Sequence, residues 1–70
     1  MTREEAHKIR IGSLVQYAHI GRHETEESLG IVTSETSQYD ENMYVDVHWF
    51  DGTYHGIHPL LHPNISLINA

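Results

Sequence analysis

The sequence predicts a small all-β protein in which five short strands close into a barrel, and three observations lead to that fold class. Apolar and polar residues alternate along several short segments, which is the period of a strand with one buried face. Polar connections separate these segments, and one of them, Asp51-Gly52, is a strong hairpin signal. No segment is expected to form a helix long enough to cover a sheet. A five-stranded sheet with one apolar face must then curl on itself to bury that face.

The chain is long enough for one domain only. A protein of 70 residues buries only about 60% of the surface that its unfolded chain exposes, so its own core gives limited stability. The sequence contains no cysteine, which excludes a disulfide framework and thiolate zinc sites. A partner subunit, or a metal bound by histidines, would be the remaining source of extra stability.

The predicted elements follow one another in a simple order. Residues 1–11 form an N-terminal arm, in which Thr2 and Glu5 have the spacing of a capping box, and residues 12–70 form the barrel. Gly30 lies inside the second strand and marks a bulge or a close approach of two backbones. Polar loops are expected at 20–28 and 36–42, a 3₁₀ turn at 58–64, and strands at 13–19, 29–35, 43–50, 53–57 and 65–68.

The strand over residues 43–50 shows the clearest alternation. Val45, Val47 and Trp49 share one of its faces. Because all three are large and apolar, we expect this face to lie in the core of the barrel.

The opposite face of that strand carries the candidate site. Tyr44, His48 and Phe50 point outward there, and Tyr54 joins them across the hairpin. Exposed aromatic patches usually mark a partner surface, because aromatic side chains bury a large area at low entropic cost. We therefore expect these four residues to bind a protein partner or a second copy of the chain, which would form a homo-oligomer. The alternative is that the N-terminal arm covers them.

Three histidines form a candidate metal site. His55, His58 and His62 are spaced by three and four residues, which could bring their imidazoles together across a turn. Zinc or nickel would bind neutral imidazole nitrogens, with Asp51 or His48 as further ligands. His58 and His62 each precede a proline, which favours extended geometry over one helical face. Hydrogen-bonded or solvent-exposed histidines are the alternative.

The charge of the chain argues against a nucleic-acid surface. The sequence has four lysines and arginines and ten aspartates and glutamates, a formal net charge of −6 with neutral histidines. Such a field repels phosphate backbones. The alternative function is a nucleic-acid-binding barrel with a basic N-terminal arm, because Arg3, Lys8 and Arg10 lie in that arm and only Arg22 lies elsewhere. The seven histidines would change the surface charge sharply just below neutral pH.

No motif in the sequence points to catalysis or to a cofactor. The chain has no glycine-rich phosphate loop and no G-x-S-x-G motif, and its acidic residues cluster in predicted loops. We therefore expect a non-catalytic interaction or scaffolding module that does not bind nucleic acid. The apolar stretches are far shorter than the ~20 residues that cross a bilayer. The N-terminus also lacks the apolar core of a secretory signal, so the expected location is the cytoplasm, away from membranes.

Four motifs carry a resemblance to a known family: Gly12-Ser13-Leu14-Val15, Leu29-Gly30-Ile31-Val32, Val45-Asp46-Val47-His48-Trp49-Phe50-Asp51-Gly52, and the turn at 58–63 before Ile65-Ser66-Leu67-Ile68. Together they resemble the SH3-like barrels, including Tudor-like and KOW-like members. Their rhythm is also similar to that of short proteins from tailed phages and their marine relatives, which implies a host cytoplasm. Such barrels serve many unrelated tasks, so the resemblance implies no particular activity. A KOW-type nucleic-acid binder would carry basic loops, whereas the loops here are acidic.

Overall fold

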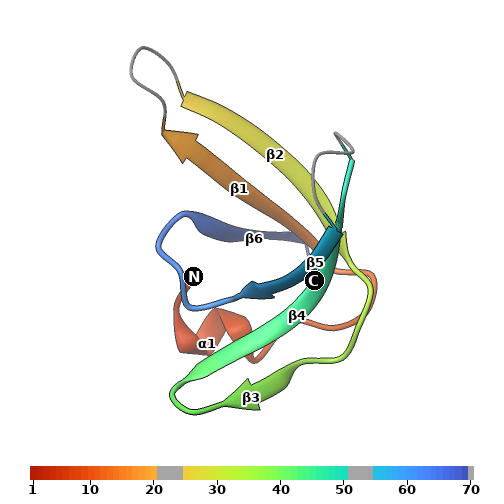
Figure 1. Cartoon of the computed structure of the whole chain (residues 1–70), viewed down its shortest axis with the longest axis vertical. Coiled ribbons are helices and arrows are strands. Elements are labelled where there is room, and N and C mark those ends of the chain that lie inside the picture. The colour runs from red at the N-terminus through yellow and green to blue at the C-terminus, as the bar shows by residue number, and fades with distance from the viewer. Residues whose placement is uncertain (21–24, 51–54, 70) are drawn as a thin grey trace.

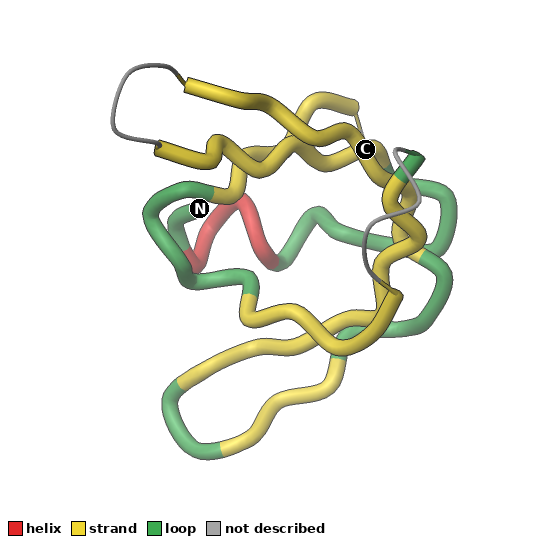
Figure 2. The backbone as a smooth tube through the Cα atoms, turned by 45° about the horizontal axis from the view of Figure 1, so that its top comes forward, coloured by secondary structure: helices red, strands yellow, loops and turns green. Residues whose placement is uncertain are grey.

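The computed structural model describes residues 1–20, 25–50 and 55–69, which form one curled antiparallel sheet and a short helix (Figure 1). The all-β fold class is therefore confirmed, and the sheet curls into a half-barrel (Figure 2). The elements in chain order are α1 (Arg3–Ala6), β1 (Leu14–Ile20), β2 (Thr25–Val32), β3 (Ser37–Tyr39), β4 (Asn42–Trp49), β5 (His55–Pro59) and β6 (Ile65–Asn69).

The strands are ordered β3-β4-β2-β1-β6, and β5 pairs with β4 outside this path. β1 pairs with β2 and with β6. His48 of β4 is paired with both Ile31 of β2 and His55 of β5, so β2 and β5 lie on opposite edges of β4. Tyr44 of β4 is likewise paired with both β3 and β5. It follows that β3 lies on the same edge of β4 as β2.

The described part of the chain has six strands where the sequence predicted five, because the polar segment 36–42 contains a strand of its own. β2 and β3 follow each other along one edge of β4. Between them, the Thr33 amide donates to the Asp46 carbonyl oxygen at 2.9 Å, and the Asp46 amide donates to the Ser34 hydroxyl at 2.9 Å. Residues 33–36 therefore interrupt what is in effect one long strand beside β4.

Two further boundaries differ from the prediction. β2 begins at Thr25, inside the segment 20–28 that was predicted to be a loop, because Thr25 to Ser28 pair with β1. β5 continues through Pro59, which the sequence placed in a 3₁₀ turn at 58–64. The connection from β5 to β6 forms turns, and no residue that the structure describes lies in a 3₁₀ helix.

Pro59 is tolerated in β5 because its nitrogen does not face β4. The Leu60 amide donates to the Met43 carbonyl oxygen at 2.7 Å. In an antiparallel pair only every second residue makes such bonds with a given neighbour. Pro59 therefore occupies a position that makes none with β4, and its missing N–H costs the ladder no hydrogen bond.

The core lies on the inner face of the curled sheet. Val45, Val47 and Trp49 are only 2%, 2% and 3% exposed, so the prediction that this face of the strand is buried is confirmed. Leu60, in the segment 58–64 that was predicted to form a 3₁₀ turn, is also fully buried. The other buried apolar residues are Ala6, Ile9, Val15, Val32, Met43 and Ile65.

The N-terminal segment packs against this core (Figure 1). The predicted capping box is confirmed, because the Thr2 hydroxyl accepts from the Glu5 amide while the Glu5 carboxylate accepts from the Thr2 amide. Ala6 and Ile9 then bury their side chains among the strands. The Met1 ammonium donates to three backbone carbonyl oxygens between the end of β5 and the start of β6, at 2.6–3.0 Å. Residues 1–11 therefore contribute side chains to the core of the domain.

Candidate interaction surface

Three of the four predicted partner-binding residues lie on the outer face of β4. Phe50, directly after the strand, is 57% exposed, His48 is exposed and Tyr44 is half-buried. The rings of His48 and Phe50 meet edge to face, with centroids 6.3 Å apart. The fourth residue, Tyr54, lies outside the described residues, as does the predicted Asp51-Gly52 turn.

Aliphatic side chains of the neighbouring strands β2 and β5 lie on the same outer face of the sheet. On β2, Leu29 is 47% exposed, and its carbonyl oxygen accepts from the Phe50 amide at 2.8 Å. Ile31 follows on the same face of β2, directly opposite His48. On β5, Ile57 is 65% exposed. We call the set of Leu29, Ile31, Phe50 and Ile57 the outer strip.

Leu29, Ile31 and Ile57 were not among the predicted site residues, although the sequence contains a signal for two of them. Leu29 and Ile31 flank Gly30, so strand alternation places both on the face opposite to that glycine. Their position beside Phe50 depends on the register between β2 and β4, which a single sequence does not reveal. Ile57 is an isolated apolar residue among histidines and glycine, and only its pairing with β4 shows which face it occupies.

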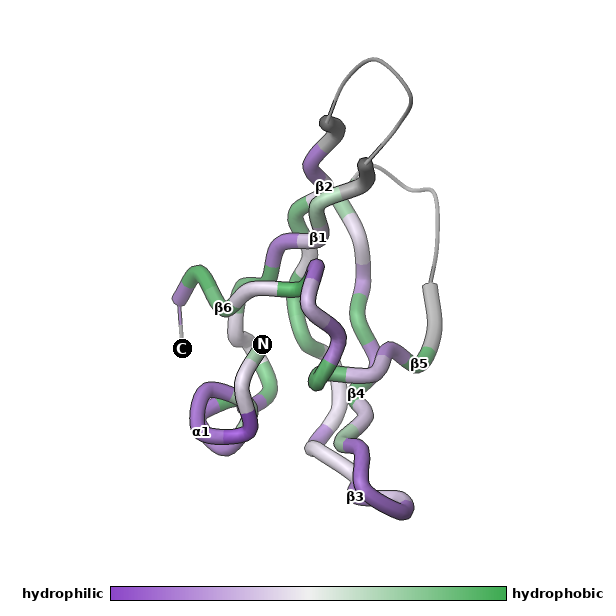
Figure 3. The backbone as a smooth tube through the Cα atoms, turned by 90° about the vertical axis from the view of Figure 1, so that its left-hand side faces the viewer, coloured by the Kyte–Doolittle hydropathy of each residue, from purple (hydrophilic) through white to green (hydrophobic). Residues whose placement is uncertain are grey.

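The outer strip is distinct from the hydrophilic parts of the molecule. α1 and β3 are hydrophilic along most of their length in Figure 3. Within the described part of β4 and β5, Asp46 is the single carboxylate, and it lies opposite Ile57. Singly exposed apolar residues are normal on any protein, whereas several exposed on one face of a sheet favour an interaction site. Leu29, Phe50 and Ile57 are exposed on this face, on either side of the polar β4 residues Asp46 and His48.

Trp49 and His58 form a hydrogen bond on the inner face of the sheet. The indole Nε1–H donates to His58 Nε2 at 2.9 Å, and the two rings are nearly perpendicular with centroids 5.1 Å apart. Because Nε2 accepts this bond, the neutral imidazole carries its proton on Nδ1. Burial lowers the pKa of His58 from its usual value, which favours the same neutral form.

Two of the three candidate metal-binding histidines, His58 and His62, have separate hydrogen-bond partners in the structure. His62 Nδ1 accepts from the Asn64 amide at 3.1 Å, and its ring lies 5.5 Å from that of Tyr17. His58 Nε2 is occupied by Trp49. The side chain of His55 is not among those described. In residues 1–20, 25–50 and 55–69, no three histidine, aspartate or glutamate side chains are grouped so as to hold a metal ion.

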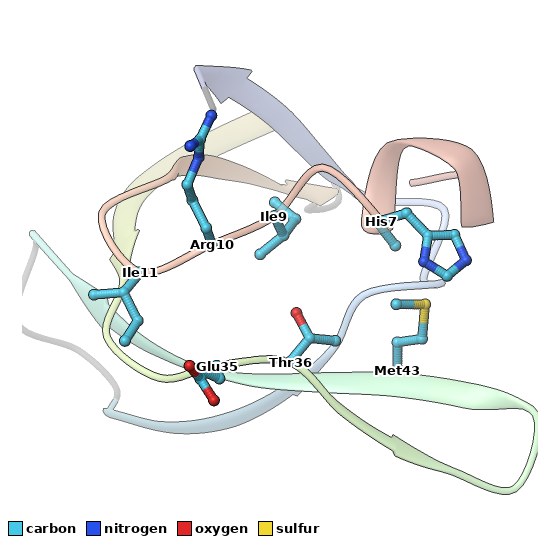
Figure 4. Close-up of a pocket in the computed structure, with 8 residues that line it drawn as sticks. His7, Ile9, Arg10, Ile11, Glu35, Thr36 and Met43 are labelled. Carbon is cyan, nitrogen blue, oxygen red and sulfur yellow. The ribbon is translucent and has the colours of Figure 1, made fainter.

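A groove of about 500 Å³ separates the N-terminal segment from the connection between β2 and β3 (Figure 4). The side chains of Ile9, Thr36 and Met43 point into the space between the two segments, whereas Arg10 and Glu35 point away from it (Figure 4). Apolar side chains and the polar Thr36 therefore line the interior of the groove, and the charges of Arg10 and Glu35 lie on its rim. Its lining residues are Ala6, His7, Ile9, Arg10, Ile11, Glu35, Thr36 and Met43.

The cations of the N-terminal arm lie on the surface of the described molecule. Arg3 is engaged, because its guanidinium donates to the Glu41 carbonyl oxygen at 2.8 Å. Lys8 and Arg10 are exposed on the segment that follows α1. Arg22 lies outside the described residues.

Comparison with known proteins gives no match to a family model, a curated protein or a solved structure. The fold and the surface are therefore interpreted from this chain alone. None of the helices in the described residues is long and apolar enough to span a membrane.

Proposed function

We propose that this chain is a non-catalytic interaction module with an SH3-like barrel, and that it associates with a second copy of itself through the β5 side of the outer strip. The strand order supports the SH3-like assignment. When β2 and β3 are counted as one interrupted strand, four consecutive strands are neighbours and β6 returns to pair with β1. That is the order expected of a small barrel opened along one seam.

The exposure of Ile57 is the observation that carries the proposed self-association. Ile57 is the most exposed aliphatic side chain among the described residues, at 65%, and it lies on the outer face of β5, opposite Asp46 of β4. A domain of 70 residues has a small core, so contact with a second copy would add apolar burial that the single chain does not supply.

Sedimentation equilibrium of the purified protein from low micromolar to millimolar concentration tests the proposal. We expect the average mass of the wild-type protein to rise with concentration, and Ile57→Ser to weaken the association several-fold. Tyr39→Ser is the matched control, because Tyr39 is 71% exposed on β3, away from the outer strip. A wild-type protein that stays monomeric at millimolar concentration contradicts the proposal, as does an equal loss of association in both variants.

A further inference from the structure

The backbone of β5 has one edge that faces β4 and one that faces away from it. The Leu60 amide bonds to the Met43 carbonyl oxygen, so the residues that exchange hydrogen bonds with β4 are those spaced by two from Leu60. They are His58, opposite Val45, and Gly56, opposite Val47. The residues between them direct their N–H and C=O groups to the opposite edge.

The hydrogen bonds on the other side of β4 give the same alternation independently. The Phe50 amide donates to the Leu29 carbonyl oxygen, and the Asp46 carbonyl oxygen accepts from Thr33. The even-numbered residues of β4 therefore face β2, and the odd-numbered residues, including Val47, face β5. Two separate sets of bonds thus agree on which β5 residues face outward.

The outward edge of β5 offers a short set of backbone groups. Ile57 presents both an N–H and a C=O there, His55 presents the same two groups, and Pro59 presents a C=O alone. β4 is the single strand paired with β5 in the part of the chain that the structure describes. An unpaired strand edge of this kind is a template for a further strand.

We infer that the outward edge of β5 pairs with β5 of a second copy in an antiparallel arrangement, with the two-fold axis at Ile57. This inference rests on the proposed self-association and gives its geometry. Each Ile57 N–H donates to the Ile57 carbonyl of the other copy, and each His55 N–H donates to the Pro59 carbonyl of the other copy. The register needs no N–H from Pro59, which has none.

Three features of β5 favour a second copy as the occupant of this edge. The arrangement is isologous, so the same groups satisfy each other on both sides of the axis. Ile57 lies at that axis, where its exposed side chain meets its equivalent directly. β5 also carries no carboxylate, which limits repulsion between two chains that each have a net charge of −6.

Hydrogen exchange measured by NMR at low and high protein concentration tests this geometry. The Ile57 amide faces outward, so we expect it to exchange rapidly in the monomer and to slow in proportion to the dimeric fraction. The Gly56 and His58 amides face β4 and are the internal controls, because they should be protected at every concentration. An Ile57 amide that stays unprotected while the mass doubles overturns strand pairing.

A pair of variants separates the backbone contribution from the side chain. Ile57→Pro removes the outward N–H and leaves the ladder to β4 intact, whereas Ile57→Ser removes the apolar side chain and keeps the N–H. We expect Ile57→Pro to weaken association by about tenfold beyond Ile57→Ser, and Tyr39→Ser on β3 to leave it unchanged. If Phe50→Ser abolishes association and Ile57→Pro is no worse than Ile57→Ser, the faces of the two sheets pack together and edge pairing is wrong. If the wild-type protein does not associate at all, the proposed function itself fails.

Discussion

Gly30→Ala tests the packing of β2 against β4, because a Cβ atom added at Gly30 would overlap with atoms of β4. Gly30 lies on the inner face of β2, opposite Trp49. A Cβ atom at this position would lie 2.6 Å from Val47 Cγ1, 2.7 Å from Trp49 Cε3 and 3.1 Å from the His48 carbonyl oxygen. Contacts under 3.0 Å essentially do not occur for real Cβ atoms, so the neighbours must move. The sequence predicted a bulge or a close approach of two backbones at Gly30, whereas the two closest atoms belong to the side chains of Val47 and Trp49.

The cost of the substitution follows from how little room these neighbours have. Val47 and Trp49 are 2% and 3% exposed, so neither side chain can move away into solvent. Overpacking of a core costs about 1–3 kcal/mol. Replacing glycine by alanine recovers roughly 0.4–1 kcal/mol through the unfolded chain. We therefore expect a net loss of about 1–2 kcal/mol, against a total stability of roughly 4–10 kcal/mol for a domain of this size.

Urea denaturation followed by the fluorescence of the single tryptophan, Trp49, measures this loss. Ser37→Ala on exposed β3 is the control and should be within about 0.5 kcal/mol of the wild-type protein. In a double-mutant cycle, Val47→Ala should recover part of the loss in the Gly30→Ala background, because it removes one clashing methyl group. A Gly30→Ala protein as stable as the wild type would refute the close approach of the two strands.

Two further predictions concern protonation and salt. Because the pKa of His58 is lowered in the folded protein, the unfolded chain binds more protons than the folded chain once the pH falls below about 6.5. The free energy of unfolding should therefore decrease as the pH falls from this value, until it passes the pKa of His58 in the folded protein. His58→Gln keeps an acceptor for Trp49 and should show a shallower decrease in urea titrations at successive pH values; an unchanged slope would contradict the assignment. Because each chain has a net charge of −6, self-association should strengthen several-fold between low and high salt in sedimentation experiments, and weakening by salt would indicate an interface held by ion pairs.

Strict local patterns made part of the fold predictable. The alternation of Val45, Val47 and Trp49 identified the inner face of β4, because a strand of period two fixes its faces without reference to any other segment. The spacing of Thr2 and Glu5 identified the capping box for a similar reason. In each case the interaction that decides the structure lies within a few residues of sequence.

The differences from the prediction all depend on contacts between distant segments. Thr25 and its neighbours are polar, and they form a strand only because β1 supplies hydrogen-bond partners. Pro59 stays in β5 because its nitrogen faces away from β4, which depends on the register of the hairpin. Leu60 lies in a segment that the sequence placed in a turn, and its complete burial depends on its packing in the apolar cluster formed by distant segments.

The candidate surface was also predictable only in part from the sequence. His48 and Phe50 were placed correctly on the outer face by alternation alone. Ile57 was not identified, because the sequence does not show the pairing of β4 with β5, which determines its exposure and its place on an edge strand of the described sheet. The part of the site that strand pairing creates is therefore the part that sequence analysis missed.

The proposed dimer brings β5 of two copies of this chain together. Amide chemical shifts recorded as the protein is diluted from millimolar to low micromolar concentration can locate this contact, because each residue reports on its own surroundings. We expect the shifts of β5 to change along one two-state binding curve while those of β3, around Tyr39, stay constant. Shifts that do not depend on concentration, or that change at β3 and not at β5, would contradict the proposed dimer.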